Sequence, residues 1–296
     1  MQEKTQAEYR SLAEHFYATK LRGQPPSPKR VADALAACSA DYRPASWRRL
    51  RCAIAYDQEA KGYGDAAERI RAVENLARKQ GLPMKPKQRR ATEINAKDEK
   101  KLLDHLGMSG DVEVAAAVVM AKYLGVRPAE MMDVRIRNGM VEIRGAKKSH
   151  EGARGADRVV DVHPDVLQII ATCIGHLQSS PRGLVGVQDR LRRICSGLWP
   201  QRKALPTLYT FRHQLGSDLK AHGVDRVEIA YLMGHQATKS VDQYGDKRRG
   251  RTKPLLRPAP GADLSQVRVN HIESRTLKAP QLEPPAPAPD DFDFGF

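Results

Sequence analysis

Apolar and polar positions alternate over the first 82 residues with the spacing of amphipathic helices. Apolar side chains recur every three or four residues, as at Trp47, Leu50 and Ile54, so they fall on one face of a helix. Segments that contain glycine or proline interrupt the pattern at residues 23–28, 42–44 and 62–65. Since such segments end helices, the pattern predicts a bundle of four helices over residues 1–82.

Residues 83–92 break the helical pattern with two prolines and four basic residues. A chain of 296 residues exceeds what one hydrophobic core usually organises, so we expect a domain boundary here. An extended basic segment suits contact with a DNA backbone, although a simple hinge would have a similar composition. We therefore predict a basic linker between two domains.

The pattern of residues 93–250 predicts a mainly helical second domain with one small antiparallel sheet. Helical patterns cover residues 96–106 and 111–124, and the second is apolar on nearly every side, which predicts a buried helix. Residues 140–144 and 158–162 alternate like strands, and the polar stretch between them predicts a long hairpin turn. Helices resume from Asp165.

The chain from Arg251 to its end predicts a disordered tail. Residues 282–289 are too rich in proline for a helix or a sheet. The last segment, residues 290–296, combines aspartate with phenylalanine and opposes the basic body of the chain in sign. Three roles fit it: a docking peptide for an accessory protein, an acidic tail that folds back on the basic surface, or no function.

The charge of the chain favours a polyanionic partner. Lysine and arginine number 50 against 35 aspartates and glutamates, a formal net charge of +15, and phosphate neutralisation by such a surface favours nucleic-acid binding. A merely basic soluble protein is the alternative. No apolar run approaches the length of a bilayer crossing, and the polar start of the chain lacks a secretion signal. We therefore expect a cytoplasmic, nucleoid-associated protein with no membrane partner.

The cysteines do not predict a metal site. Cys38, Cys52, Cys173 and Cys195 are scattered, without a paired spacing or a nearby histidine ligand, so buried thiols are expected. The sequence also has no Walker loop and no acidic cluster with convincing metal-ligand spacing. We therefore expect neither a metal nor a cofactor.

A phosphate-binding position is predicted at Arg127. Gly125 would end one helix and Pro128 would occupy the first turn of the next, which places the guanidinium at a helix start. The positive helix dipole and the guanidinium then converge on one point, as suits a phosphate. Taken alone, an ion pair between Arg127 and Glu130 is the simpler interpretation.

Arg212 lies near the start of another predicted helix. The pattern places this helix over residues 211–222, with Thr210 as its N-cap and Gly223 as its end. Arg212 would thus open its helix, in the same electrostatic position as Arg127.

The next helix is predicted between Asp225, its N-cap, and Gly234, its terminating glycine. His235 would lie just beyond it, and Tyr244 follows nine residues later. Taken singly, His235 is a helix-ending polar residue and Tyr244 an ordinary amphipathic tyrosine. A phenol, guanidiniums, an imidazole and a lysine can together break and rejoin a phosphodiester without a metal.

In order and spacing these motifs resemble the tyrosine recombinase (phage integrase) family over roughly residues 90–250. The resemblance implies a mainly α, integrase-like DNA breaking and rejoining fold. Its parts would be a helical core-binding domain over residues 1–82 and a catalytic domain with a small antiparallel β-sheet over residues 93–250. The implied partners are double-stranded DNA and further copies of the chain, as a homotetramer on paired sites. The motifs that carry the resemblance are Leu-Gly-Val-Arg-Pro-Ala-Glu around Arg127, the strand pair with Lys147-Lys148, Arg212-His213, and Met-Gly-His followed by Tyr244.

The resemblance also implies a catalytic role for four of these residues. Arg127 and Arg212 would hold the non-bridging oxygens of the scissile phosphate, and His235 would hydrogen-bond the same group. Tyr244 would be the nucleophile, because a phenol with adjacent positive charge can attack phosphorus. The resulting 3′-phosphotyrosyl link could then be displaced by a 5′-hydroxyl, so strands are exchanged without ATP.

Other family positions fall on neighbouring residues of the motifs. The hairpin lysine, a proposed acid for the leaving 5′-oxygen, matches Lys148 or its neighbour Lys147, and Lys148 is preferred because a small polar residue follows it. Glu130 matches the supporting acid after the first arginine, and His213 matches the histidine after the second.

One catalytic position departs from the family pattern. The family usually has a histidine three residues before its second arginine, and this chain has Tyr209 there. A tyrosine can hydrogen-bond a phosphate but shuttles protons poorly near pH 7. Two alternatives to a site-specific recombinase therefore stay open: a catalytically weak or inactive DNA-binding protein, and a type IB-like enzyme that relaxes DNA.

Basic side chains outside the motifs are the candidate DNA contacts. They lie in the predicted bundle and the linker, and solvated helix faces are the alternative interpretation. The candidates are Lys29, Arg30, Arg48, Arg49, Arg51, Lys85, Lys87, Arg89 and Arg90.

Overall fold

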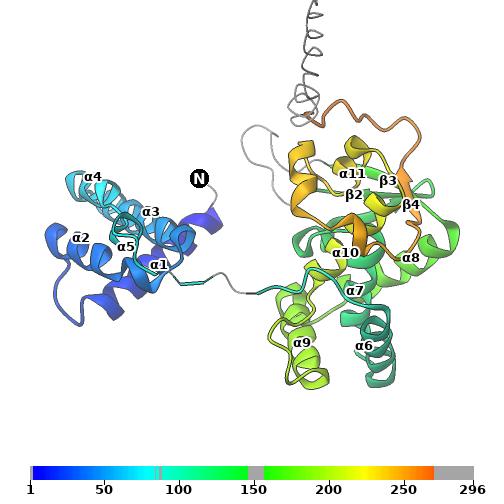
Figure 1. The fold of residues 1–296 in the computed structure, drawn as a ribbon, viewed down its shortest axis with the longest axis horizontal. Coiled ribbons are helices and arrows are strands. Elements are labelled where there is room, and N and C mark those ends of the chain that lie inside the picture. Colours follow the sequence, from blue (N-terminus) through cyan, green and yellow to red (C-terminus); the bar gives the residue numbers. More distant parts are fainter. Residues whose placement is uncertain (1–2, 84, 87–88, 146–156, 270–296) are drawn as a thin grey trace, which may run out of the picture. The chain divides into compact units, whose positions relative to one another are not determined.

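The computed structural model describes residues 3–83, 85–86, 89–145 and 157–269, and the chain divides into two compact units (Figure 1). The first unit is residues 1–88 and the second is residues 89–296. The division falls inside the proline-containing stretch of residues 83–92. Each unit has its own core of buried apolar side chains.

The N-terminal unit is a small helical bundle. Apolar positions with the predicted spacing meet in its core, where Phe16, Leu35 and Ile54 are buried. The indole of Trp47 donates a hydrogen bond to the carbonyl of Leu35 at 3.0 Å, which joins two of the helices. Among the described residues, the four predicted helices are present, together with a 3₁₀ turn and a short fifth helix that the pattern did not predict. The elements are α1 (Glu3–Lys20), α2 (Pro28–Ala37), η1 (Cys38–Asp41), α3 (Pro44–Ala60), α4 (Gly64–Ala72) and α5 (Leu76–Lys79).

The C-terminal unit is mainly helical around α7 (Val112–Leu124), which packs against α8 (Pro164–Gln178) and α10 (Leu208–Ala221). Seven of the 13 residues of α7, between Val114 and Leu124, are buried, which confirms the buried helix that its apolar sequence predicted. Along the described part of the chain, no helix is long and apolar enough to cross a bilayer. The remaining helical elements are α6 (Ala96–Ser109), η2 (Pro128–Asp133), α9 (Gly183–Leu198), α11 (Arg226–Leu232), η3 (Thr238–Gln243) and η4 (Lys247–Arg249).

An antiparallel sheet of order β1-β2-β3-β4 covers one side of these helices (Figure 1). The two predicted strands are β2 (Met140–Ile143) and β3 (Arg158–Val162), paired in the register Val141 to Val160. Two further strands, β1 (Val134–Arg137) and β4 (Leu256–Pro258), were not predicted. The hairpin between β1 and β2 turns through Asn138 and Gly139, which both have positive φ, a conformation that asparagine and glycine adopt readily.

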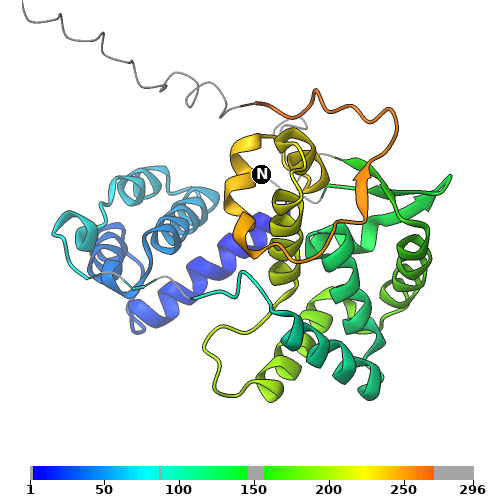
Figure 2. The same ribbon diagram turned by 45° about the vertical axis from the view of Figure 1, so that its right-hand side comes forward.

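The expectation of a disordered segment from Arg251 onward is wrong for residues 251–269. Strand β4 pairs with β3 at the edge of the sheet, as Figure 2 shows in orange beside green. Further along, the amide of Arg268 donates to the carbonyl of Gln236 at 2.9 Å, and Val267 is buried. The composition of this segment did not exclude a strand, because an edge strand tolerates the proline at its end. The acidic, phenylalanine-containing segment of residues 290–296 lies outside the described residues.

Replacement of Leu256 tests this docking. Leu256 is 8% exposed and its neighbour Leu255 is 39% exposed. We expect Leu256→Ala to lower the free energy of unfolding by about 2 kcal/mol, since a buried leucine loses its contacts and leaves a cavity. The matched change Leu255→Ala should alter it by less than about 0.5 kcal/mol. Urea unfolding followed by circular dichroism measures both, and equal effects of the two changes would contradict the docked strand.

Candidate active site

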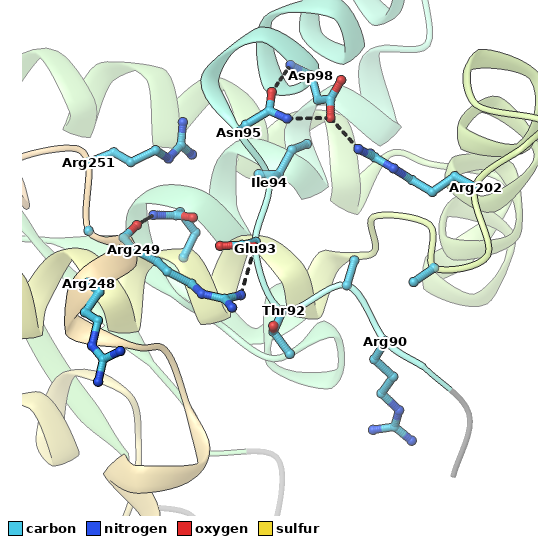
Figure 3. Close-up of a pocket in the computed structure, with 14 residues that line it drawn as sticks. Arg90, Thr92, Glu93, Ile94, Asn95, Asp98, Arg202, Arg248, Arg249 and Arg251 are labelled. Carbon is cyan, nitrogen blue, oxygen red and sulfur yellow. Dashed lines mark hydrogen bonds and ion pairs between the residues drawn. The ribbon is translucent and has the colours of Figure 1, made fainter. Parts of the chain in front are cut away.

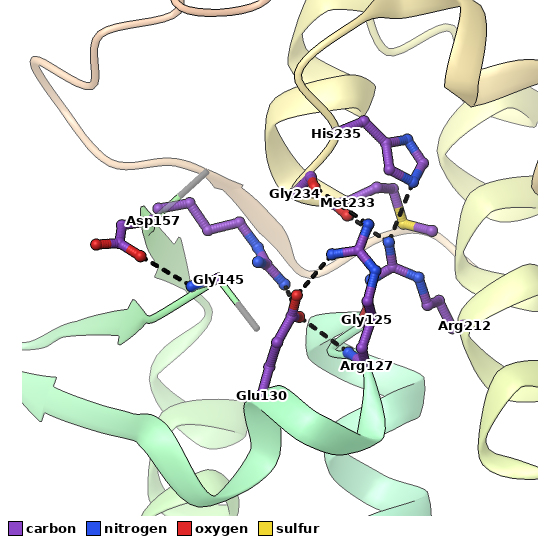
Figure 4. Close-up of polar contacts among 10 residues, drawn as sticks. Gly125, Arg127, Glu130, Gly145, Asp157, Arg212, Met233, Gly234 and His235 are labelled. Atoms are coloured by element: carbon purple, nitrogen blue, oxygen red, sulfur yellow. Dashed lines mark hydrogen bonds and ion pairs between the residues drawn. The ribbon is translucent and has the colours of Figure 1, made fainter. Parts of the chain in front are cut away.

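The carboxylate of Glu130 lies at the centre of a cluster of arginines (Figure 4). As predicted, Gly125 ends α7 with a φ of +60°, and Pro128 begins the next helical turn, η2, with Arg127 as its N-cap. Glu130, three residues on, accepts hydrogen bonds from the Arg127 amide at 2.9 Å and from Arg127 Nη1 at 2.6 Å. Burial raises the pKa of the Glu130 carboxyl, but the charges of Arg158 and Arg127 outweigh burial and hold this pKa at about 2. The carboxylate is therefore ionised at every physiological pH.

Arg158 is the member of this cluster that the sequence motifs did not predict. Its side chain is fully buried at the start of β3, and its Nη2 donates to Glu130 Oε2 at 3.0 Å. The alternation of the strand contained the signal, because it places Arg158 on the same buried face as Val160 and Val162. A charged residue on an apolar face needs a buried partner.

Arg212 contributes the third guanidinium, from α10. It is 0% exposed and donates to the carbonyls of Gly125 and Met233. Burial, followed by the nearby charges of Arg127 and Arg158, lowers the pKa of Arg212 to about 9. Arg212 remains cationic at neutral pH.

The N-cap predicted for α10 was wrong. The helix begins at Leu208 with Thr207 as its N-cap, and Thr210 is already a helical residue. The hydroxyl of Thr210 accepts from the Thr207 amide at 2.9 Å and donates to the Ala91 carbonyl at 2.8 Å. Both threonines are good caps, so the sequence alone did not distinguish them. Arg212 therefore lies one turn inside the helix and not at its mouth.

His235 lies just beyond α11, as predicted, after the terminating Gly234 with a φ of +59°. A Cβ on Gly234 would lie 2.6 Å from Arg158 Nη1, so glycine allows the arginine to approach this turn. His235 is buried, and its Nε2 lies 3.2 Å from Arg212 Nη2. Burial, followed by the charge of Arg212, lowers the pKa of His235 to about 2. The ring is therefore neutral, with Nε2 as the acceptor and the proton on Nδ1.

The Tyr244 ring lies against this cluster. It follows η3 and stacks on His213 with a centroid separation of 4.7 Å. The His235 ring lies 4.8 Å away on a tilted plane, and the Arg212 guanidinium carbon lies 4.9 Å from the Tyr244 ring centroid. The structure therefore brings together six of the predicted site residues. Four are the predicted catalytic residues Arg127, Arg212, His235 and Tyr244, and two are the supporting residues Glu130 and His213.

The cluster carries an excess of buried positive charge. Three guanidiniums face one carboxylate and a neutral imidazole, which leaves two positive charges uncompensated. Among the described residues, Arg158 Nε and Nη1 and Arg212 Nε are buried without a hydrogen-bond partner. Such donors favour a bound anion with several oxygens. No group of histidines, cysteines and carboxylates in the described ranges could hold a metal ion.

Two other predicted catalytic positions are not part of the cluster as described. Tyr209 lies on the first turn of α10, and its side chain is 45% exposed. Lys147 and Lys148 lie outside the described residues. The ends of their hairpin are joined by a hydrogen bond of 2.8 Å from the Gly145 amide to Asp157 Oδ1.

The candidate DNA contacts differ in exposure and in whether their charged groups already bind other groups of the chain. Arg49 pairs with Glu8 at 2.5 Å, and Arg51 is partly buried, with its guanidinium donating to the Val73 carbonyl. Lys29 pairs more weakly with Asp33 at 3.4 Å, and Arg30 donates to the carbonyl of Pro25. Lys87 lies outside the described residues. Lys29 and Arg49 are exposed, and so are Arg48, Lys85, Arg89 and Arg90, which form no ion pair with another described residue.

A groove of about 560 Å³ on the C-terminal unit is lined by five arginines (Figure 3). Three of them are paired with carboxylates: Arg202 with Asp98, Arg249 with Glu93 and Arg251 with Glu99. The other two are Arg90 and Arg248. No residue of the Glu130 cluster lines this groove, so the two features are separate.

No family model matches the chain, and no curated protein matches its sequence. Solved structures do share its fold. A lambda integrase dimer bound to a COC′ core site has a TM-score of 0.59 at 20% identity, covering 86% of this chain and 92% of that one. A lambda integrase tetramer bound to a Holliday junction has a TM-score of 0.57 at 18% identity, covering 85% and 74%. The Tn1549 transposon integrase in complex with a circular intermediate DNA has a TM-score of 0.56 at 12% identity, covering 83% and 90%.

These likenesses show that the chain has the tyrosine recombinase fold. They confirm the predicted fold class, a mainly helical chain with a small antiparallel sheet.

The neutrality of His235 predicts a pH dependence of stability. Its pKa is about 2 in the folded chain and about 6.5 in an unfolded one, so below pH 6.5 only the unfolded state takes up this proton. The free energy of unfolding should therefore fall by up to about 1.4 kcal/mol per pH unit as pH drops from 6.5 to 5. We expect His235→Gln to lose that slope and the exposed-histidine control His176→Gln to keep it. Identical slopes in wild type and His235→Gln, from urea unfolding at each pH, would rule out a buried neutral histidine.

Proposed function

We propose that this chain is a site-specific DNA recombinase that cleaves and rejoins strands through Tyr244. One observation carries the proposal: a phenol lies against a buried cluster with two excess positive charges and unpartnered guanidinium nitrogens. A scissile phosphate supplies the anion that such a cluster lacks. The shared fold supports the assignment, because the lambda integrase and Tn1549 integrase structures contain DNA.

In the proposed reaction, the phosphate binds to the guanidiniums beside the Tyr244 ring. Arg127 and Arg212 hold its non-bridging oxygens and offset the charge that grows in the pentavalent transition state. The Tyr244 oxygen attacks phosphorus and its phenolic proton passes to water, while the bond to the 5′-oxygen breaks and that oxygen takes up a proton. Lys148 or Lys147 is the proposed proton donor. Since the phosphodiester energy is stored in the phosphotyrosyl bond, a 5′-hydroxyl from another strand can reverse the step.

His235 supports the phosphate in this scheme as a neutral group. Burial, followed by the charges of the arginines, to which an imidazolium would add a third excess charge, holds its pKa at about 2. A bound phosphate would offset the arginines and raise that pKa. His235 is thus suited to hydrogen-bond the phosphate when DNA is bound.

For the biological setting, we propose integration or excision of a mobile element by a tetramer on paired DNA sites. A second candidate function is DNA binding without turnover. It is favoured by Tyr209, which stands exposed where the family has a histidine able to move protons at neutral pH.

Paired tyrosine variants separate these two functions. The substrate is a set of duplexes that the protein selects from a random pool, each carrying a nick at a different position so that cleavage is trapped. We expect Tyr244→Phe to keep DNA affinity and to abolish the covalent band on a denaturing gel. The control Tyr209→Phe should keep the band and lower its rate of formation, by about tenfold if the phenol hydrogen-bonds the phosphate.

Covalent adducts from Tyr244→Phe would refute the nucleophile assignment. Bound DNA without adducts in the wild type would favour the DNA-binding function.

DNA binding by the proposed recombinase should depend steeply on salt. A protein that contacts six or more phosphates should show a slope of about −5 or steeper in log affinity against log salt. Replacing one exposed phosphate contact, as in Arg48→Gln, should reduce the slope by about one. Fluorescence anisotropy from 50 to 200 mM salt measures both, and a shallow wild-type slope would contradict contacts with many phosphates.

A further inference from the structure

The backbone on both sides of Tyr244 is bound by one side chain, that of Lys220 in the last turn of α10. Its ammonium group donates to the carbonyls of Val241 at 2.9 Å, Tyr244 at 2.7 Å and Gly245 at 2.8 Å. These three bonds use all three ammonium hydrogens. Lys220 therefore fixes the peptide that follows the tyrosine as well as the turn that precedes it.

Two other residues of α10 hold the next part of this loop. His213 Nδ1 accepts from the Gly245 amide at 3.3 Å, and Ser217 Oγ accepts from the Asp246 amide at 3.0 Å. Residues 213, 217 and 220 are spaced by four and three, so they share one face of the helix. The loop around Tyr244 thus lies along a single stripe of α10.

Small residues bring the loop and the helix into direct contact. A Cβ on Gly216 would lie 3.2 Å from the Tyr244 carbonyl oxygen, and a Cβ on Gly245 would lie 2.3 Å from the Ser217 amide nitrogen. Gly245 also has a φ of +71°, which side chains other than glycine rarely adopt. The close approach lets the lysine reach three carbonyls at once.

The chemistry of this contact requires a lysine. A methionine of similar length has no donor, and the planar guanidinium of an arginine directs its hydrogens in one plane and not toward a cone of three carbonyls. Burial lowers the pKa of Lys220, while Asp242 and Asp246 oppose that shift and Arg226 adds to it. A partly buried cation at this place is a structural cost that the three carbonyls offset.

We infer that Lys220 is a positioning residue for the reaction: it holds the Tyr244 backbone on α10, the same helix that carries Arg212. The inference rests on the proposed function. One rigid helix then sets the separation between the nucleophile and the guanidinium that binds its target, and a displacement of about 1 Å in such a geometry can slow a reaction about 100-fold. Lys220 itself does not touch the phosphate.

The test compares Lys220→Met and Lys220→Arg with wild type in single-turnover cleavage of the nicked duplexes and in equilibrium DNA binding. We expect Lys220→Met to slow cleavage about 100-fold while the dissociation constant changes less than about twofold, and Lys220→Arg to restore part of the rate. If Lys220 mattered only for folding, its replacement by methionine would lower both the DNA affinity and the cleavage rate.

Hydrogen exchange of the free protein gives a readout that does not need activity. Amides of residues 241–246 should exchange faster in Lys220→Met than in wild type. The control Lys239→Met, which removes an exposed lysine from the same loop, should leave their exchange rates unchanged. Wild-type protein that binds DNA without a covalent adduct would overturn the proposed function. Two outcomes in which wild type does cleave would overturn this inference alone. Lys220→Met would cleave as fast as wild type, or its amides of residues 241–246 would exchange as slowly as those of wild type.

Discussion

Two arginines share one fully buried carboxylate in the C-terminal unit, and the geometry of the site depends on that pairing. Glu130 binds Arg127 from its own helical turn and Arg158 from β3. Removing one partner of a buried ion pair typically costs about 3–5 kcal/mol, because an uncompensated charge remains. Arg127 also donates to the Gly234 carbonyl at 3.1 Å, so the same network holds the turn that positions His235.

The pairing leaves positive charge in the cluster uncompensated, and this excess charge gives the site its chemistry. A stable core would balance its buried charges, whereas this cluster keeps two excess positive charges beside a phenol. Helix α10 connects the two halves of the arrangement. Its Arg212 belongs to the cluster, and its Lys220 binds the loop of Tyr244. Anion binding and nucleophile position are therefore properties of one helix, and both depend on its docking against α7.

Local rules of sequence predicted much of this arrangement, because many of its features are helix ends. Gly125, Pro128, Asp225 and Gly234 lie at the helix ends where the sequence predicted them. Thr207 and Thr210 both satisfied the rule for an N-cap, and the prediction of Thr210 was wrong. Arg158 was missed because its importance comes from a partner 28 residues away in sequence, and β4 was missed because pairing with β3, not its own composition, makes it a strand. Lys220 was missed because its partners are backbone carbonyls, which no side-chain pattern reveals.

The identity of the residue that becomes linked to DNA tests the account most directly. Wild-type protein trapped on the nicked duplexes would be digested with trypsin and nuclease and its peptides analysed by mass spectrometry. Cleavage after lysine and arginine separates Tyr244, in Ser240–Lys247, from Tyr209, in Ala204–Arg212. We expect a nucleotide linked through its phosphate to Tyr244 alone. A nucleotide on the Tyr209 peptide, or an adduct at any other residue, would contradict it.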